Sequence, residues 1–161
     1  MPHTMFTEIM LTVVVASIAA FLAAAFYSNI SSFYDIYRAT IDSEKDKMVT
    51  NIKIIYATNT SSTTAKLWVK NIGQRAIHSN ILTKSTLIFG PVAECYLVNY
   101  NASNPPLWGF YLVSDFDSDG VWDPSETIEI LVVWGEPLPL GDYYAKLILY
   151  NGVSDEYYFS I

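Results

Sequence analysis

The feature that most constrains the fold is an uncharged segment near the start of the chain, from Ile9 to Tyr34. It is bounded by Glu8 on one side and Asp35 on the other. A helix needs about 20 consecutive apolar residues to cross the hydrocarbon core of a membrane. The sequence therefore predicts a short N-terminal tail at residues 1–8, followed by a transmembrane helix and its extension at residues 9–47.

A cleaved signal peptide is the alternative interpretation of this segment. Signal peptides have a basic first region and a shorter apolar stretch, whereas residues 1–8 contain an acid and no lysine or arginine. A retained membrane anchor is therefore favoured. Small side chains along the segment favour close packing against like helices in lipid, and thus a homo-oligomer, although a lone anchor has the same composition. The predicted helix-packing residues are Glu8, Ala16, Ala20, Ala23 and Ala24.

Two signals disagree on the orientation in the membrane. Basic residues follow the segment but do not precede it, which favours a cytoplasmic C-terminal side. Three acceptor sequons would instead be usable only on an exported domain. The glycosylation candidates are Asn29, Asn59 and Asn101. Beyond the membrane, residues 29–47 keep hydrophobic side chains at helical spacing and predict a continuing helix, with a flexible stalk after Ser31-Ser32 as the alternative.

The periodicity changes at Met48, where short segments rich in β-branched and aromatic residues begin. Seven or eight such strands favour an all-β domain over residues 48–161, an antiparallel β-sandwich of immunoglobulin type. Asn151-Gly152 predicts a type I′ turn between the last two strands. The predicted strands are 51–56, 66–70, 76–82, 94–98, 107–113, 127–134, 143–150 and 153–159.

Composition excludes several classes of function. Nine basic residues against sixteen acidic ones, for a formal charge of −7, cannot neutralise a nucleic acid backbone. His78 lies in a strand-like segment, and Cys95 among apolar residues indicates a buried, inert thiol. With no serine nucleophile motif in the sequence, an enzyme is not expected. Five aromatic residues could line a sugar-binding surface, although core positions explain them better: Trp108, Phe110, Tyr111, Trp122 and Trp134.

Charge is divided unevenly along the chain. Residues 41–84 sum to +4 and residues 85–161 to −10. If the two parts occupied opposite faces, neighbouring subunits would meet with complementary potentials. Interleaved strands would instead mix the charges within one domain.

An acidic segment at residues 115–126 matches the calcium-loop pattern D-x-[DN]-x-[DN]-G-x₅-E. Carboxylates stand at positions 1, 3, 5, 9 and 12, and Gly120 at position 6 permits a sharp turn. Such a group of carboxylates repels itself without a cation. The sequence predicts a structural Ca²⁺ site, with a solvated acidic turn as the alternative. The candidate ligands are Asp115, Asp117, Asp119, the Val121 carbonyl, Asp123 and Glu126.

The order of these parts resembles the archaeal flagellin-like family. The resemblance rests on the apolar helix with Glu8 at its start and on two segments of the β domain, LWVKNIG at 67–73 and DGVWDPSETI at 119–128. Within the family the chain looks most like the small archaellum accessory proteins of the F and G types, slightly more like G. Archaellins and pilins carry a basic leader and a processing site, whereas this chain has His3 at a plausible processing position.

The resemblance implies a structural role in archaeal motility. It implies a stator component of the cell envelope, anchored in the membrane by a single helix with its β domain outside. Partners would be other archaellum accessory proteins or the surface-layer protein. A glutamate near the helix start contacts a neighbouring subunit in pilins, a role that Glu8 could take. A pilin-like or archaellin-like filament subunit and an anchored extracellular binding module are the alternatives.

Overall fold

The computed structural model describes residues 2–161, including the side chains of 5–113 and 115–161. It contains two compact units, Met1–Glu44 and Lys45–Ile161. The boundary lies three residues before the predicted junction at residues 47 and 48. Residues 45–49, the last turn of the helix, therefore belong to the unit that contains the strands.

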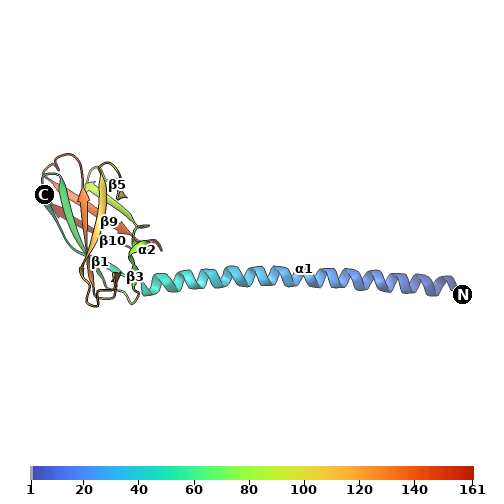
Figure 1. Ribbon diagram of the computed structural model, residues 1–161. Coiled ribbons are helices and arrows are strands. Elements are labelled where there is room, and N and C mark those ends of the chain that lie inside the picture. Colours follow the sequence, from blue (N-terminus) through green and yellow to red (C-terminus); the bar gives the residue numbers. More distant parts are fainter. Residues whose placement is uncertain (1) are drawn as a thin grey trace. The chain divides into compact units, whose positions relative to one another are not determined.

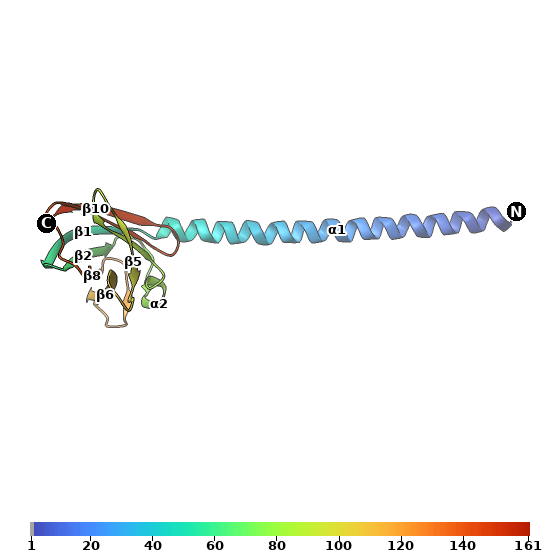
Figure 2. The ribbon, with the colours of Figure 1, turned by 90° about the horizontal axis from the view of Figure 1, so that it is seen from above.

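Helix α1 spans Pro2–Val49 in one continuous run of 48 residues (Figures 1 and 2). It includes residues 2–8, which the sequence analysis assigned to a tail, and it ends two residues later than predicted. Proline is compatible with a first helical turn, and no other proline or glycine occurs before Gly73. The helix continues through Ser31-Ser32, where Ser32 Oγ donates to the Ser28 carbonyl at 3.0 Å, so a stalk does not interrupt it.

The remaining residues form an eight-stranded sheet in the order β1-β2-β8-β6-β5-β4-β9-β10. All neighbours are antiparallel except β5 and β6, which are parallel. The edge strands β1 and β10 lie close together. Asp155 on β10 accepts a hydrogen bond from the Ile54 amide on β1 at 2.7 Å and forms an ion pair with Lys53 at 3.0 Å. The strands are β1 (Ile52–Ser61), β2 (Thr64–Asn71), β4 (Thr86–Pro91), β5 (Tyr96–Tyr100), β6 (Leu107–Ser114), β8 (Thr127–Val133), β9 (Asp142–Ile148) and β10 (Ser154–Ser160).

The core lies between the strands and follows from their alternation. In β2 and β8 every second residue is buried, among them Leu67 and Ile130, while the residues between them face outward. The prediction of a long helix followed by a mostly antiparallel β domain is therefore confirmed. Two strands were not predicted: β4, whose Leu87 and Phe89 are fully buried, and the two-residue β7 (Val121–Trp122).

The segment predicted as a strand at 76–82 is mostly not a strand. It consists of β3 (Ile77–His78) followed by the short helix α2 (Ser79–Leu82). Strand β3 pairs with β7 (Val121–Trp122) in a separate two-stranded sheet. Ser79 Oγ donates to the Gly120 carbonyl at 2.8 Å. This contact links α2 to the acidic segment rather than to the large sheet.

The predicted type I′ turn between the last two strands is wrong. Such a turn needs a positive φ at both central residues, but of the pair only Gly152 has one, at 84°. The Gly152 amide donates to Leu149 O at 2.9 Å, and the Leu149 amide donates to Val153 O at 2.8 Å. The connection is a three-residue turn in which Asn151 keeps a negative φ. Its side chain instead donates to Asp46 and Thr50, at the end of α1.

The uneven charge of the sequence is mixed within the β domain. Lys53 pairs with Asp155, and Lys66 pairs with Glu129 at 2.7 Å. Each pair joins the basic part of the sequence to the acidic part: the first lies between β1 and β10, and the second between the neighbouring strands β2 and β8. For these pairs, the strands from the basic and acidic parts of the sequence are interleaved, so the opposite charges lie side by side.

Candidate metal site and membrane helix

The acidic segment 115–126 is the loop that joins β6 to β8. Strand β7 lies within it and is held by its pairing with β3. Three of its residues have a positive φ: Ser118 at 61°, Gly120 at 75° and Ser125 at 74°. The positive φ of Gly120 shows the sharp turn expected there. Glycine adopts this conformation without steric cost.

Glu126 holds the loop together from inside. Its side chain is only 2% exposed. Oε1 accepts a hydrogen bond from the Phe116 amide at 2.8 Å, and Oε2 accepts one from the Asp123 amide at 3.0 Å. Its backbone carbonyl accepts the Trp122 indole N–H at 3.1 Å. Glu126 thus connects both ends of the loop, a role that the sequence pattern did not indicate.

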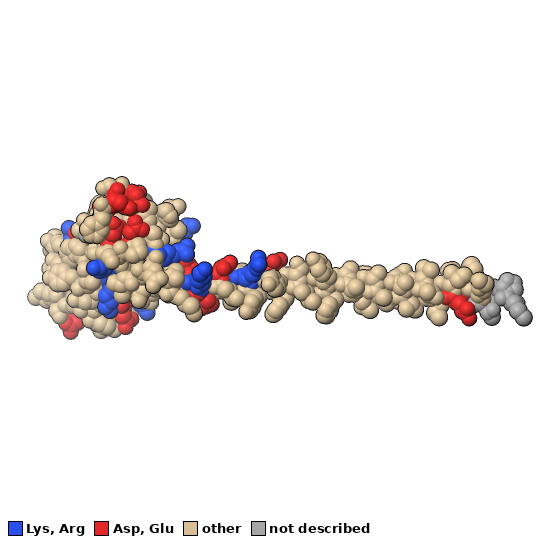
Figure 3. Space-filling view, turned by 90° about the horizontal axis from the view of Figure 1, so that it is seen from below, with Lys and Arg blue, Asp and Glu red and all other residues tan. Residues whose placement is uncertain are grey.

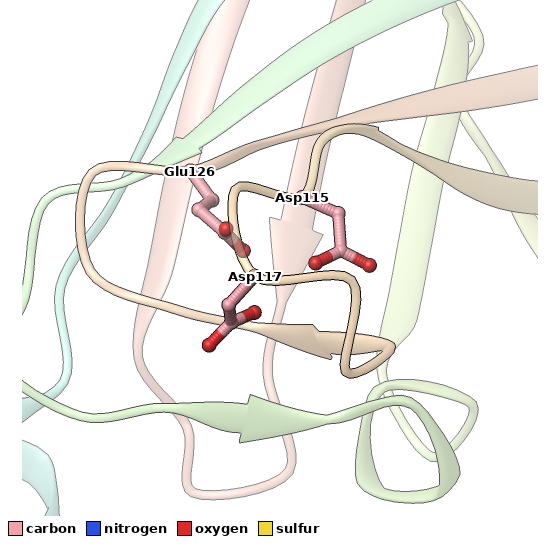
Figure 4. A group of neighbouring side chains, drawn as sticks. All are labelled: Asp115, Asp117 and Glu126. Carbon is pink, nitrogen blue, oxygen red and sulfur yellow. The ribbon is translucent and has the colours of Figure 1, made fainter.

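The other carboxylates gather around the same point. Oxygens of Asp115, Asp117 and Glu126 lie within 4.8 Å of one another, as do those of Asp117, Asp119 and Asp123. Figure 4 shows the first three side chains directed toward a common region. Asp117 belongs to both groups, so the structure brings all five predicted carboxylates into one cluster. Figure 3 shows acidic side chains concentrated on one projecting part of the β domain.

Two aspartates also shape the backbone of the loop. Asp115 Oδ2 accepts from the Gly120 amide at 3.2 Å, and Asp119 Oδ1 accepts from the Val121 amide at 2.7 Å. Val121 itself lies in β7, opposite His78. That the Val121 carbonyl oxygen coordinates a metal ion remains a prediction.

The residues present fit a hard cation. Asp115 Oδ1 is buried and has no hydrogen-bond partner among the described residues, although its second oxygen has one. Burial first, and then the charges of Asp119, Asp117, Glu126 and Asp115, raise the pKa of Asp123. Oxygen ligands in such a group are those that Ca²⁺ prefers. A cation would offset the mutual repulsion that raises this pKa.

In the part of the chain that the structure describes, one helix is long and apolar enough to cross a membrane. At about 1.5 Å per residue, α1 is about 70 Å long, more than twice the roughly 30 Å of a hydrocarbon core. The predicted packing residues Glu8, Ala16, Ala20, Ala23 and Ala24 are all exposed on it. Ala20 is four residues from Ala16 and three and four residues from Ala23 and Ala24, so these alanines are neighbours on the helix surface, and Glu8 lies about two turns before Ala16.

The glycosylation candidates lie in three different settings. Asn29 is within α1, Asn59 is in β1, and Asn101 is in the turn between β5 and β6. All three side chains are exposed. Asn101 has a φ of 43°, which asparagine tolerates better than most residues do. Their use as acceptors remains a prediction.

The residues considered for catalysis or sugar binding are scattered. His78 is exposed on β3, as expected for a residue on a strand face. Cys95 is exposed rather than buried, because it lies in the β4–β5 turn, where its thiol approaches the Pro91 carbonyl at 3.4 Å. Trp108 and Trp122 are fully buried in the core. The five aromatic residues therefore do not form one exposed surface; Phe110 and Trp134 are partly buried, and Tyr111 is exposed.

These features define a class of protein: a mostly antiparallel β domain that follows a single long apolar helix. No family model matches the chain. The predicted resemblance is confirmed by solved structures of the archaellum stator. The chain is similar to the archaellum periplasmic stator protein FlaG of Sulfolobus acidocaldarius, with a TM-score of 0.59 and 29% identity over 68% of this chain and 99% of that one.

Two further proteins are similar to this chain. A chain in the FlaF–FlaG periplasmic stator complex of the same organism matches with a TM-score of 0.59 and 29% identity, over 70% of this chain and 90% of that one. An uncharacterised protein of Archaeoglobus fulgidus is 25% identical over 129 residues, 77% of either chain. Both of these solved structures are of archaellum stator proteins.

Proposed function

We propose that this protein is a membrane-anchored structural component of an archaellum stator, which links the motor to the cell envelope. The observation that carries the proposal is the similarity to FlaG, which extends over nearly the whole of that solved chain. The apolar helix α1 supports anchoring in the membrane. In this role the β domain supplies contacts and no catalysis.

The partner of the β domain in this proposal is an archaellum accessory protein of the F type. The solved complex of FlaF and FlaG supports this choice. The surface-layer protein is a second partner that the position in the envelope would bring within reach. We further propose that copies of the chain associate through α1, whose apolar side chains from Met5 to Ile41 are largely exposed and exceed the length that one bilayer covers.

The β domain lies outside the cytoplasmic membrane in this proposal. The description of FlaG as periplasmic supports that orientation. We also propose that its fold belongs with the immunoglobulin-like and archaellin-like sandwiches. The approach of the edge strands β1 and β10, which sets two layers of strands around one core, supports this relationship.

Calcium is proposed as a structural ion of the acidic loop. The cluster around Asp117 and the unpartnered oxygen of Asp115 support it. The ion would join the β6 and β8 ends of the loop, which Glu126 already connects through backbone amides. It would have no part in sensing, because the loop is flanked by strands and not by a pair of movable helices.

The experiment that tests the stator role is cross-linking in the membranes of an organism that carries this chain. A photo-reactive amino acid is placed at exposed positions of the β domain, such as Tyr56 and Tyr111, and the purified adducts are identified by mass spectrometry. We expect adducts with archaellum accessory proteins. Long polymers of the chain itself would support a filament subunit instead, and adducts with glycans alone would support an anchored binding module.

A further inference from the structure

An open groove of about 740 Å³ lies at the end of the β domain away from the acidic loop. The antiparallel strands β6 and β8 connect the two places: the acidic loop joins Ser114 to Thr127, whereas Leu107 and Val133 pair at the other end. The groove is bordered there by the β4–β5, β5–β6 and β8–β9 connections. It is separate from the candidate metal site.

The groove is held in shape by its surroundings. The Trp134 amide donates to Thr63 O at 2.8 Å. The Trp134 ring packs edge-to-face on Tyr96, with centroids 5.6 Å apart, and on buried Phe89 at the same distance. Gly135 lies so close to Pro105 that a Cβ on it would stand 2.6 Å from the proline Cβ. These contacts set the groove before any ligand arrives, which lowers the cost of binding.

The chemistry of the groove is aromatic and acidic. Tyr96 and Trp134 present ring surface, Pro91 and Pro137 present rigid apolar walls, and the carboxylates of Glu94 and Glu136 stand beside them without a lysine or arginine in the lining. Glu94 raises the pKa of Tyr96, first by a hydrogen bond to its hydroxyl and then, after burial, by its charge.

The lining of the groove contains two carboxylates and no basic residue. All of its lining residues come from residues 85–161, whose one basic residue, Lys146, pairs with Glu156 at 3.7 Å. Aromatic faces and carboxylates both attract a cation, and the guanidinium of arginine can stack on a ring while it donates two hydrogen bonds to a carboxylate.

We propose that this groove binds an arginine side chain presented by a partner protein, which stacks on Tyr96 and Trp134 and pairs with Glu94 and Glu136. Charge complementarity selects this occupant over a neutral one. The inference rests on the proposed function only in assigning the arginine to a protein partner. The preference of the groove for a guanidinium is tested on this chain alone, so its failure would leave the stator role standing.

The test uses the full-length chain in detergent micelles with its four tryptophans replaced by 5-fluorotryptophan. The probe is N-acetyl-arginine methylamide, and the neutral comparison is N-acetyl-citrulline methylamide, which has nearly the same shape. The ¹⁹F resonance of Trp134, assigned with W134F, is expected to shift saturably with the arginine probe. Binding of the citrulline probe should be about tenfold weaker, which corresponds to about 1.4 kcal/mol.

Two variants complete the test. The double variant E94Q/E136Q should remove the preference for arginine, whereas D35N/D42N, with the same change in net charge on α1, should keep it. Equal shifts with both probes, or no shift of Trp134, would overturn the proposal. A shift with an oligosaccharide but not with the arginine probe would overturn it in favour of a glycan site.

Discussion

Replacing Glu126 by glutamine tests whether this residue stabilises the acidic loop without a metal ion. Both carboxylate oxygens accept backbone amides, from Phe116 at 2.8 Å and Asp123 at 3.0 Å. The side chain is buried, so water cannot replace either partner. In E126Q one oxygen becomes an NH₂ group that faces an amide N–H, and the other accepts as a neutral group.

The expected loss follows from these two bonds. A hydrogen bond to a charged group contributes about 1.5–3 kcal/mol, and a neutral one about 1 kcal/mol. Losing one charged bond and weakening the other should cost about 3 kcal/mol, reduced somewhat by relief of repulsion within the cluster. For a β domain of this size the midpoint of thermal unfolding should fall by about 10 °C.

The assay is thermal unfolding of the full-length chain in detergent with a chelator present, followed by the near-ultraviolet circular dichroism of the tryptophans. The control is D117N, which removes the same charge from an exposed carboxylate that lies in both oxygen groups. D117N should leave the midpoint unchanged or slightly raised. If E126Q and D117N unfolded at the same temperature as the unmodified chain, the stabilising role of Glu126 would be refuted.

Three further results are expected. Ca²⁺ should raise the unfolding midpoint of the chain, and D117N should remove most of that rise; no rise and no heat in a calorimetric titration would exclude the calcium site. The folded state raises the pKa of Asp123, so the chelated protein binds this proton more tightly than the unfolded chain does. The free energy of unfolding should therefore rise as the pH falls through the raised pKa and decrease as the pH increases again. In D123N this pH dependence should be flatter, as measured by thermal unfolding of the variant and the unmodified chain over a series of pH values. Asp46 accepts hydrogen bonds from Tyr150 and Asn151 and forms an ion pair with Arg75. D46N should therefore lower the free energy of unfolding, measured by denaturant titration, by about 1–3 kcal/mol. An unchanged denaturation midpoint would mean that these contacts do not hold residues 45–50 in the β domain.

Sequence periodicity predicted the main elements because their hydrophobic patterns are strong. The uncharged run from Ile9 to Tyr34 has no helix breaker, and it lies within the single helix observed. The alternation of Leu67 and Val69 likewise gives a strand with one buried face. Strand β4 was missed because it ends in Gly90 and Pro91, residues that are typical of turns.

The predictions that failed depend on long-range contacts. The segment 76–82 has strand-like residues, but Ser79 donates to Gly120 and buried Leu82 ends a short helix. Asn151 keeps a negative φ while its side chain donates to Asp46 and Thr50, more than a hundred residues away. Sequence spacing alone carries no information on such partners.

In the acidic loop, too, the sequence predicted one feature correctly and missed another. The spacing of its carboxylates predicted that they would converge, and their oxygens do lie within 4.8 Å of one another in two groups. It did not reveal that Glu126 would be buried and bound to two backbone amides, because position 12 of the pattern is read as a metal ligand. The groove around Trp134 was also missed, since it is formed where three separate connections of the β domain meet.

The stator role is tested most directly by size-exclusion chromatography of the purified full-length chain mixed in detergent with the F-type accessory protein of the same organism. Light scattering on the eluted species gives the mass of any complex. We expect the two proteins to elute together at micromolar concentration, with a mass that contains both. Separate elution of the two proteins, each at its own mass, would contradict the proposed function.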